Sequence, residues 1–195
     1  MNHFLRLFFV WTALVTATVR AESPLNLVII LADDFNYPDA AVYGGQAATP
    51  HMEKLAREGM LFSRTFQSAP MCSPTRHALY TGIHPVRSGA WPNHTFVYDG
   101  VRSLAHYLQD QGYRAGFSGK THINPPEAFP FEFITPPIKT SNPAFVTVDA
   151  FLADCVAKNQ PFGLILASNE PHTPWDHGDA SAYPPASLPL PPLLV

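Results

Sequence analysis

The sequence predicts an α/β fold with a mostly parallel sheet flanked by helices. Two nearly continuous apolar runs rich in branched residues, 25–31 and 162–168, have the composition of strands buried on both faces of a sheet. A shorter apolar segment, 113–118, predicts a third strand. Helix-like segments separate the three, and strands that alternate with helices favour parallel pairing. In such a sheet, functional side chains gather beyond the carboxyl ends of the strands.

Three intervening segments carry helical spacing. Segment 49–59 has a threonine N-cap, a first-turn proline, apolar residues on one side and a terminal glycine. Segments 101–111 and 147–158 also have apolar residues at helical spacing. Segment 60–66 instead alternates apolar and polar residues, which predicts a further strand.

The first 21 residues have the pattern of a secretory signal peptide. A short basic start precedes the apolar run Leu7 to Val19, which is too short for a comfortable membrane span. Small side chains at Val19 and Ala21 suit cleavage after Ala21. The alternative is an uncleaved N-terminal anchor. Both interpretations predict export, to a secreted, periplasmic or lysosomal location, and cleavage would leave no stable membrane span.

Composition and charge limit the remaining possibilities. The 195 residues suffice for one domain with a real core. The net charge of −3 is small and no basic tract is present, so we expect no nucleic-acid partner. Many of the 21 prolines follow Asn124 and Tyr183, where we expect long coil segments.

A short helix is predicted to begin just after Cys72. Ser73 is a suitable N-cap, Pro74 suits the first helical position, and Gly82 can end the helix. Cys72 would then lie at the helix mouth, where unpaired N–H groups and the helix dipole favour an anion. Arg76, about one turn on, would point back toward the same place. A nucleophile beside an anion pocket suits the transfer of a sulfuryl or phosphoryl group.

The two cysteines allow other interpretations. Cys72 alone could be structural or redox-sensitive. In an exported protein the pair would usually suggest a disulfide between Cys72 and Cys155. We disfavour it, because Cys155 lies on or near the apolar face of the helix-like segment 148–156 and suits a core position.

Adjacent carboxylates, Asp33 and Asp34, follow the first predicted strand. In a regular strand they would face opposite sides, but a bend at the strand end could turn both toward one hard cation such as Ca²⁺ or Mg²⁺. The alternative is a solvated turn. The thiol of Cys72 would be an odd ligand for such a cation, which prefers oxygen.

Lysine and histidine side chains follow the other two strands. Lys120 and His122 would share one face of an extended segment, where a lysine suits sulfate and a histidine can move a proton near neutral pH. The alternative is an exposed loop. His172 follows the last strand. The other histidines of the folded region lack such support and are expected to be surface or outer-sphere residues: His51, His77, His84, His94, His106 and His177.

Three motifs resemble the sulfatase family. The run Cys72-Ser73-Pro74-Thr75-Arg76, followed by Thr81-Gly82, resembles the signature Cys-x-Pro-x-Arg with its later Thr-Gly. Gly119-Lys120-Thr121-His122 resembles the family's Gly-Lys-x-His element, and His172-Thr173-Pro174 its His-x-Pro element. The resemblance covers nearly the whole chain after the signal peptide. It is closest to the heparan N-sulfatase (sulfamidase) branch, through the stretches 101–104, 119–122 and 129–133.

The resemblance implies an alkaline-phosphatase-like fold and a role for each motif residue. Cys72 would be converted by a formylglycine-generating enzyme to formylglycine, whose hydrate supplies a nucleophile and a metal ligand. Asp33, Asp34 and converted Cys72 would hold Ca²⁺, with Mg²⁺ as the alternative. The remaining roles are stabilisation of the diol for Arg76, contact with sulfate and diol for Lys120, deprotonation of the diol for His122, and general acid for His172. The substrate would be a sulfated saccharide, with a sulfate ester or a sulfamate hydrolysed.

The sequence departs from the family after His172. Sulfatases have a later Asp followed by Asp, Asn or His that completes the metal site, a further lysine and a smaller C-terminal domain. Residues 22–195 are therefore expected to be an incomplete, N-terminal part of the catalytic domain, poorly active alone.

Two other functions remain open. A phosphate or phosphonate ester hydrolase of the same superfamily more often uses Ser or Thr and a transition metal, so the intact Cys-x-Pro-x-Arg argues against it. A non-catalytic protein that binds sulfated glycans would keep the pocket without the metal site.

Overall fold

The computed structural model describes residues 24–136 and 141–188. The predicted signal peptide, residues 1–21, and the proline-rich end, residues 189–195, lie outside the described residues. Within the described ranges, none of the helices has both the length and the apolar character needed to cross a membrane.

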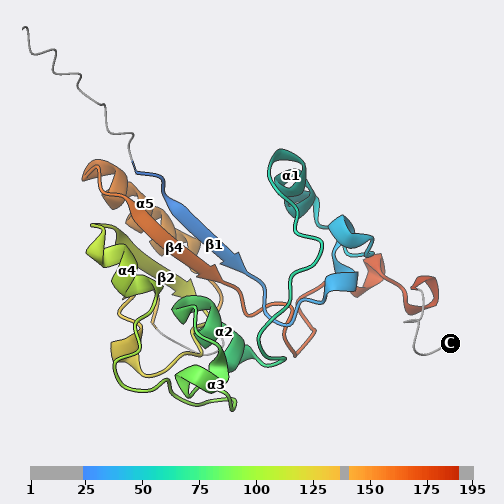
Figure 1. Ribbon diagram of the computed structural model, residues 1–195. Helices are drawn as coiled ribbons and strands as arrows, with labels where there is room; N and C mark the ends of the chain where they lie inside the picture. The colour runs from blue at the N-terminus through green and yellow to red at the C-terminus, as the bar shows by residue number, and fades with distance from the viewer. Residues whose placement is uncertain (1–23, 137–140, 189–195) are drawn as a thin grey trace, which may run out of the picture.

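A four-stranded parallel sheet forms the centre of the described fold (Figure 1). Its strands, in spatial order, are β1 (Leu27–Leu31), β4 (Phe162–Ala167), β2 (Arg114–Gly119) and β3 (Glu132–Phe133). The three apolar segments therefore form strands as predicted, and their parallel pairing confirms the predicted fold class. The last long strand, β4, lies between the first two.

Helices cover both faces of this sheet. The α-helices of the described residues are α1 (Pro50–Glu58), α2 (Cys72–Thr81), α3 (Pro85–Ser88), α4 (Leu104–Asp110) and α5 (Phe145–Ala157). Short 3₁₀ turns lie at Tyr37–Asp39, Ala41–Tyr43, Pro126–Ala128, Ala180–Ala182 and Pro185–Ser187. Figure 1 shows α5 on one face of the sheet and α2 with α4 on the opposite side. The three helices predicted outside the cysteine segment are confirmed.

The apolar core is divided between the two faces. Consecutive β4 residues alternate between them: Leu164 packs in the cluster of Phe151 and Cys155 from α5, and Ile165 packs in the cluster that contains Phe117. Burial of such a side chain stabilises the fold by about 1.5–3 kcal/mol. Cys155 is buried as predicted, and both cysteines are free thiols, so the alternative disulfide is not formed.

The prediction of a strand at 60–66 is wrong. This segment is coil in the structure, and Met60, Phe62 and Phe66 are largely exposed. Alternation of apolar and polar residues indicates that a segment could bury one face as a strand. A strand also needs a neighbouring strand with which to pair, and alternation does not provide one. The sheet described here offers 60–66 no such neighbour.

Candidate active site

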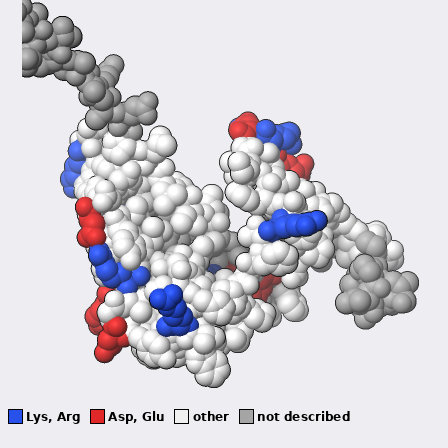
Figure 2. Space-filling model, viewed as in Figure 1, with Lys and Arg blue, Asp and Glu red and all other residues white. Residues whose placement is uncertain are grey.

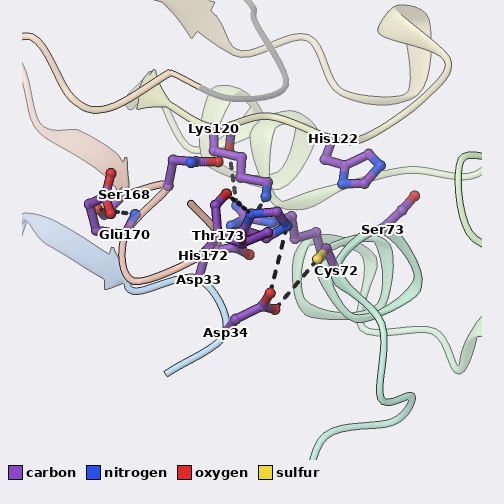
Figure 3. A network of polar contacts seen from close by, with 12 residues as sticks. Asp33, Asp34, Cys72, Ser73, Lys120, His122, Ser168, Glu170, His172 and Thr173 are labelled. Carbon is purple, nitrogen blue, oxygen red and sulfur yellow. Dashed lines mark hydrogen bonds and ion pairs between the residues drawn. The ribbon is translucent and has the colours of Figure 1, made fainter. Parts of the chain in front are cut away.

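The site is built where three strand ends meet the first turn of α2 (Figure 3). Asp33 follows β1, Lys120 follows β2, and His172 follows β4. Because β4 lies between the other two, their carboxyl ends converge at one edge. The N–H of Asp33 donates to the carbonyl of Glu170 at 2.9 Å, which joins the β1 end to the loop after β4.

Helix α2 begins two residues earlier than predicted. Its first residue is Cys72 and its N-cap is Met71, while Gly82 ends it with a left-handed φ of 69°. Ser73 is not the N-cap, and its hydroxyl lies 3.2 Å from Nδ1 of His77 instead. Pro74 is thus the third helical residue, where the backbone N–H still has no intrahelical partner to lose. The predicted position of Cys72 at the helix mouth is confirmed.

Asp33 is the buried centre of an ionic cluster. Nη2 of Arg76 donates to Oδ1 of Asp33 at 3.0 Å, and the ammonium of Lys120 donates to Oδ2. Nη1 of Arg76 also donates to the carbonyl of Lys120 at 2.9 Å. Burial opposes ionisation of Asp33, but the two cations outweigh it and hold the pKa of that carboxyl below its ordinary 3.8. The prediction that Arg76 points back toward the site is confirmed.

Four side chains can offer ligand atoms to one metal ion. Atoms of Asp33, Asp34, Cys72 and His172 all lie within 4.8 Å of one another. Sγ of Cys72 is 3.7 Å from Oδ1 of Asp34, and Nε2 of His172 is 3.6 Å from Oδ2 of the same residue. Asp34 has a left-handed φ of 57°, so the chain bends where the two carboxylates follow β1. The sequence reasoning did not place His172 in this group.

The dimensions of this group fit a hard divalent cation. Ca²⁺ binds oxygen at about 2.3–2.6 Å, so ligands on opposite sides of the ion lie about 5 Å apart. The 4.8 Å spread of the four atoms agrees with that distance. Two carboxylates suit Ca²⁺ or Mg²⁺, whereas a thiol does not. The two carboxylates therefore match such a cation better than the thiol of Cys72 and the imidazole of His172 do.

The thiol of Cys72 is held in its protonated form. Burial raises its pKa, and the nearby carboxylates of Asp33 and Asp34 raise it further, against the opposing effect of Lys120 and Arg76. The sequence predicts that the helix mouth favours an anion here. The carboxylates and the loss of solvent oppose that effect, so Cys72 is a poor nucleophile as a thiol.

His122 contacts a second histidine. It is 6% exposed, and its Nε2 lies 2.7 Å from Nδ1 of His94. A φ of 54° at His122 breaks the extended segment that we expected to place it on one face with Lys120. Instead, Lys120 contacts Asp33 and His122 contacts His94. His94 lies in a loop without periodic pattern, so the sequence reasoning missed its proximity to His122.

His77 is another histidine whose position was not predicted. It is fully buried rather than a surface residue. Its Nε2 accepts from the N–H of Asn124 at 2.9 Å, so its Nδ1 carries the proton and donates to the carbonyl of Ser73 at 2.7 Å. Burial lowers the pKa of His77. Through these two hydrogen bonds, the neutral ring links α2 to the loop that follows β2.

A cavity of about 730 Å³ opens beside the ionic cluster. Asp33, Asp34, Cys72 and Arg76 line it, together with apolar side chains that include Phe66. Figure 2 shows the hollow between the sheet and the segment carrying α1, with acidic atoms visible at its base. The cavity leads directly to the sulfur of Cys72.

Comparison with protein families matches the sulfatase family over residues 25–187. Among curated proteins, the chain is 30% identical over 155 residues to an ulvan-active sulfatase of Formosa agariphila, covering 78% of this chain and 31% of that protein. It is 38% identical over 125 residues to the human N-sulphoglucosamine sulphohydrolase, covering 62% of this chain and 25% of that protein.

Solved structures give the same fold. The crystal structure of Ps i-CgsB has a TM-score of 0.69 and 24% identity, covering 84% of this chain and 49% of that chain. The structure of BT4656 in complex with its substrate D-glucosamine-2-N,6-O-disulfate has a TM-score of 0.60 and 20% identity, covering 77% of this chain and 35% of that chain. At these identities the likeness shows the fold alone.

The fold is a parallel α/β sheet that gathers a cysteine, paired carboxylates and two cations at its carboxyl edge. The family match, which extends over most of the chain, shows that the chain belongs to the sulfatase family. It spans about a quarter to a third of the length of the two curated relatives described above.

Proposed function

We propose that this chain carries the nucleophile and part of the metal site of a sulfatase that hydrolyses a sulfate ester or sulfamate on a glycan. The observation that carries the proposal is the position of Cys72, whose sulfur at the mouth of α2 lies 3.7 Å from Asp34. The buried cations Arg76 and Lys120 share the neighbouring Asp33. Membership of the sulfatase family supports the reaction class.

Conversion of Cys72 to formylglycine by a formylglycine-generating enzyme is part of this proposal. Its hydrated aldehyde would supply the attacking oxygen and would replace a soft sulfur ligand by a hard one. The raised pKa of the Cys72 thiol supports the need for conversion, because little thiolate is present near neutral pH.

Asp33, Asp34 and converted Cys72 are proposed to hold Ca²⁺, or Mg²⁺ in its place. A bound cation would supply Lewis-acid stabilisation of charge on the sulfuryl oxygens. Lys120 and Arg76 keep Asp33 ionised, and so ready to bind a cation. The same two residues bring positive charge to the place where a sulfate group would lie.

His172 is the proposed general acid. Its Nδ1 lies 2.7 Å from the carbonyl of Thr173 and donates to it, so Nε2 is the nitrogen that faces the site. A proton on Nε2 would pass to the departing oxygen or nitrogen of the substrate. Nε2 of His172 also lies 3.6 Å from Oδ2 of Asp34, beside the proposed nucleophile. His122 is proposed to take the proton of the diol when sulfate leaves.

A sulfated saccharide of heparan type is the proposed substrate class. The human relative is named for a sulphoglucosamine, and the BT4656 structure contains a disulfated glucosamine. The predicted signal peptide supports a secreted, periplasmic or lysosomal location, where such glycans are met.

Mass spectrometry of the Cys72 peptide tests the proposal. The chain is expressed with and without a formylglycine-generating enzyme, and conversion lowers the peptide mass by about 18 Da. The Cys155 peptide is the internal control and keeps its mass. Turnover of sulfate and phosphate esters of one phenol then separates a sulfatase from a phosphatase. An unmodified thiol from a competent host contradicts the proposal and favours a glycan-binding protein.

A further inference from the structure

A second cavity, of about 530 Å³, lies between the first turn of α4 and the loop that follows β2. Tyr98, Arg102, His106 and Glu127 are among the side chains that line it. Among the described residues, none lines both this cavity and the one that opens on Cys72. A ligand in the second cavity is therefore held by side chains that the proposed reaction does not use.

Tyr98 gives this cavity an aromatic wall. The side chain of Val97 is buried, whereas the neighbouring rings of Phe96 and Tyr98 are 57% and 63% exposed, so both rings point outward. A Cβ on Gly89 would lie 2.8–2.9 Å from three carbons of the Tyr98 ring, so the ring packs directly on that glycine. The N–H of Tyr98 also donates to the carbonyl of Ser88 at 2.8 Å. The ring is thus fixed from behind and can stack against a flat apolar group.

Two basic side chains of the lining are held in fixed positions. Nδ1 of His106 accepts from the N–H of Ser103 at 3.1 Å, so the ring is neutral and its Nε2 carries the proton and can donate. Nη2 of Arg102 donates to Oδ2 of Asp110 at 2.5 Å, and Cζ of Arg102 lies 4.9 Å from the centre of the Tyr107 ring. The charge of Arg102 is therefore balanced by Asp110, and its other N–H groups remain donors.

The carboxylates of Asp99 and Glu127 decide which ligand suits the cavity. Both line it and both are exposed, and within the described ranges neither carboxylate is paired with a protein cation. They would repel a sulfate group placed in the cavity. Hydroxyl groups can instead donate to these carboxylates and accept from the neighbouring donors. A sugar ring combines such hydroxyls with an apolar face of C–H groups, which matches an aromatic wall beside a polar rim.

We propose that this cavity binds an uncharged saccharide unit, stacked on Tyr98 and hydrogen-bonded by the polar side chains of the lining. Pro125 also lines the cavity, five residues after Lys120 of the candidate active site. Five residues span at most about 18 Å, so the two sites lie within reach of one glycan chain. A sulfated unit would lie at Cys72 and an unsulfated unit of the same chain in the second cavity. This last step rests on the proposed function, whereas the binding of a neutral sugar does not.

Titration of the full, unconverted chain with neutral oligosaccharides tests the inference without any turnover. The probes are cellotriose and chitotriose, followed by calorimetry, and at least one should bind wild type with a Kd of about 1 mM or lower. Tyr98→Ala should weaken that binding about tenfold, whereas Tyr98→Phe, which keeps the ring, should stay within about twofold of wild type. Glu127→Gln, at an exposed position that the fold tolerates, should also weaken binding about tenfold. Phe145→Ala, at a 66% exposed aromatic residue of α5, is the control and should bind like wild type.

Three binding results would overturn the inference. The first is a folded wild type that binds neither probe. The second is an affinity that is unchanged in both Tyr98→Ala and Glu127→Gln. The third is binding of a trimer of glucosamine, whose amines are protonated, without binding of either neutral probe, because the carboxylates would then form a cation site.

Turnover separates this inference from the proposed function. If the converted wild type hydrolyses sulfated glycans, Tyr98→Ala should raise KM about tenfold for an oligosaccharide that also carries an unsulfated unit. The KM for a sulfate ester of phenol, which is too small to reach the second cavity, should not change. An equal effect on both substrates would contradict the binding of one chain at both sites. If the converted wild type shows no turnover, the proposed function fails, while the titration still decides whether the cavity binds a sugar.

Discussion

The buried cluster around Asp33 predicts a specific pattern of destabilisation. Among the described residues, Asp33 carries the one carboxylate that both Arg76 and Lys120 contact, and the side chains of Asp33, Arg76 and Lys120 are 5%, 5% and 3% exposed. Asp33→Asn removes the negative charge and leaves two buried cations without a counter-charge. Breaking a buried ion pair in this way costs about 3–5 kcal/mol, against a total stability of about 5–15 kcal/mol for a domain. Lys120→Met should cost less, about 1–3 kcal/mol, because Asp33 keeps its bond to Arg76.

The double variant separates this explanation from general loss of packing. In the double variant Asp33→Asn with Lys120→Met, Arg76 is the one charge of the cluster that remains. The destabilisation should therefore be smaller than the sum of the two single-variant effects. We expect a coupling energy of about 0.5–3 kcal/mol. Urea denaturation at pH 7 with EDTA, which removes any metal contribution, should show the midpoint of Asp33→Asn lowered by about 1.5–2.5 M for an m-value of about 2 kcal/mol per M. Asp149→Asn, at an exposed position on α5, is the control and should stay near wild type. Additive single effects would refute the reasoning.

Three further predictions concern other parts of the site. The pKa of His77 in the folded protein lies below its ordinary 6.5. The stability that depends on the neutral ring is therefore fully present above pH 6.5 and is lost as the pH falls toward the folded pKa. Over this pH range, the urea midpoint of His77→Gln should vary less than that of wild type. Gly119→Ala should lower the free energy of unfolding by more than about 3 kcal/mol in thermal denaturation, because φ is 97° and a Cβ would lie 2.0 Å from the carbonyl oxygen of Ala167. Gly178→Ala is the control: nothing lies within 4 Å of its Cβ position, so its free energy of unfolding should stay within about 0.5 kcal/mol of wild type. Ca²⁺ at a hundredfold excess over its Kd should stabilise the converted chain by about 2.7 kcal/mol and should not stabilise Asp34→Asn; an equal rise in Tm for both proteins would contradict the proposed metal site.

Much of the fold could be predicted because its signals are local. The apolar runs of β1 and β4 and the glycine that ends α2 need no knowledge of the rest of the chain. Strand order was not predicted, since nothing in the sequence of β4 shows that it lies between β1 and β2. The false strand at 60–66 has the same origin, because pairing depends on a distant neighbour.

The site divides in a similar way. The positions of Asp33 and Arg76 near Cys72 were anticipated from strand-end position and helical spacing, and the structure brings the two side chains into contact. The positions of His77 and His94 were not, because each is determined by a loop that folds back over α2 or the end of β2. A loop residue without periodicity gives no signal of the group it will meet. The three-dimensional arrangement was needed to pair His94 with His122.

The central place of β4 also determines when this site can assemble during synthesis. β1 and β2 pair with β4 in the sheet and not with each other. Until Ala167 has been added to the growing chain, the ends of β1 and β2 have no strand to bring them together. At about 5–20 residues per second, about 5–20 seconds pass between the addition of Cys72 and that of Ala167. Under the proposed function, the enzyme that converts Cys72 would meet the thiol during this interval, before β4 completes the site.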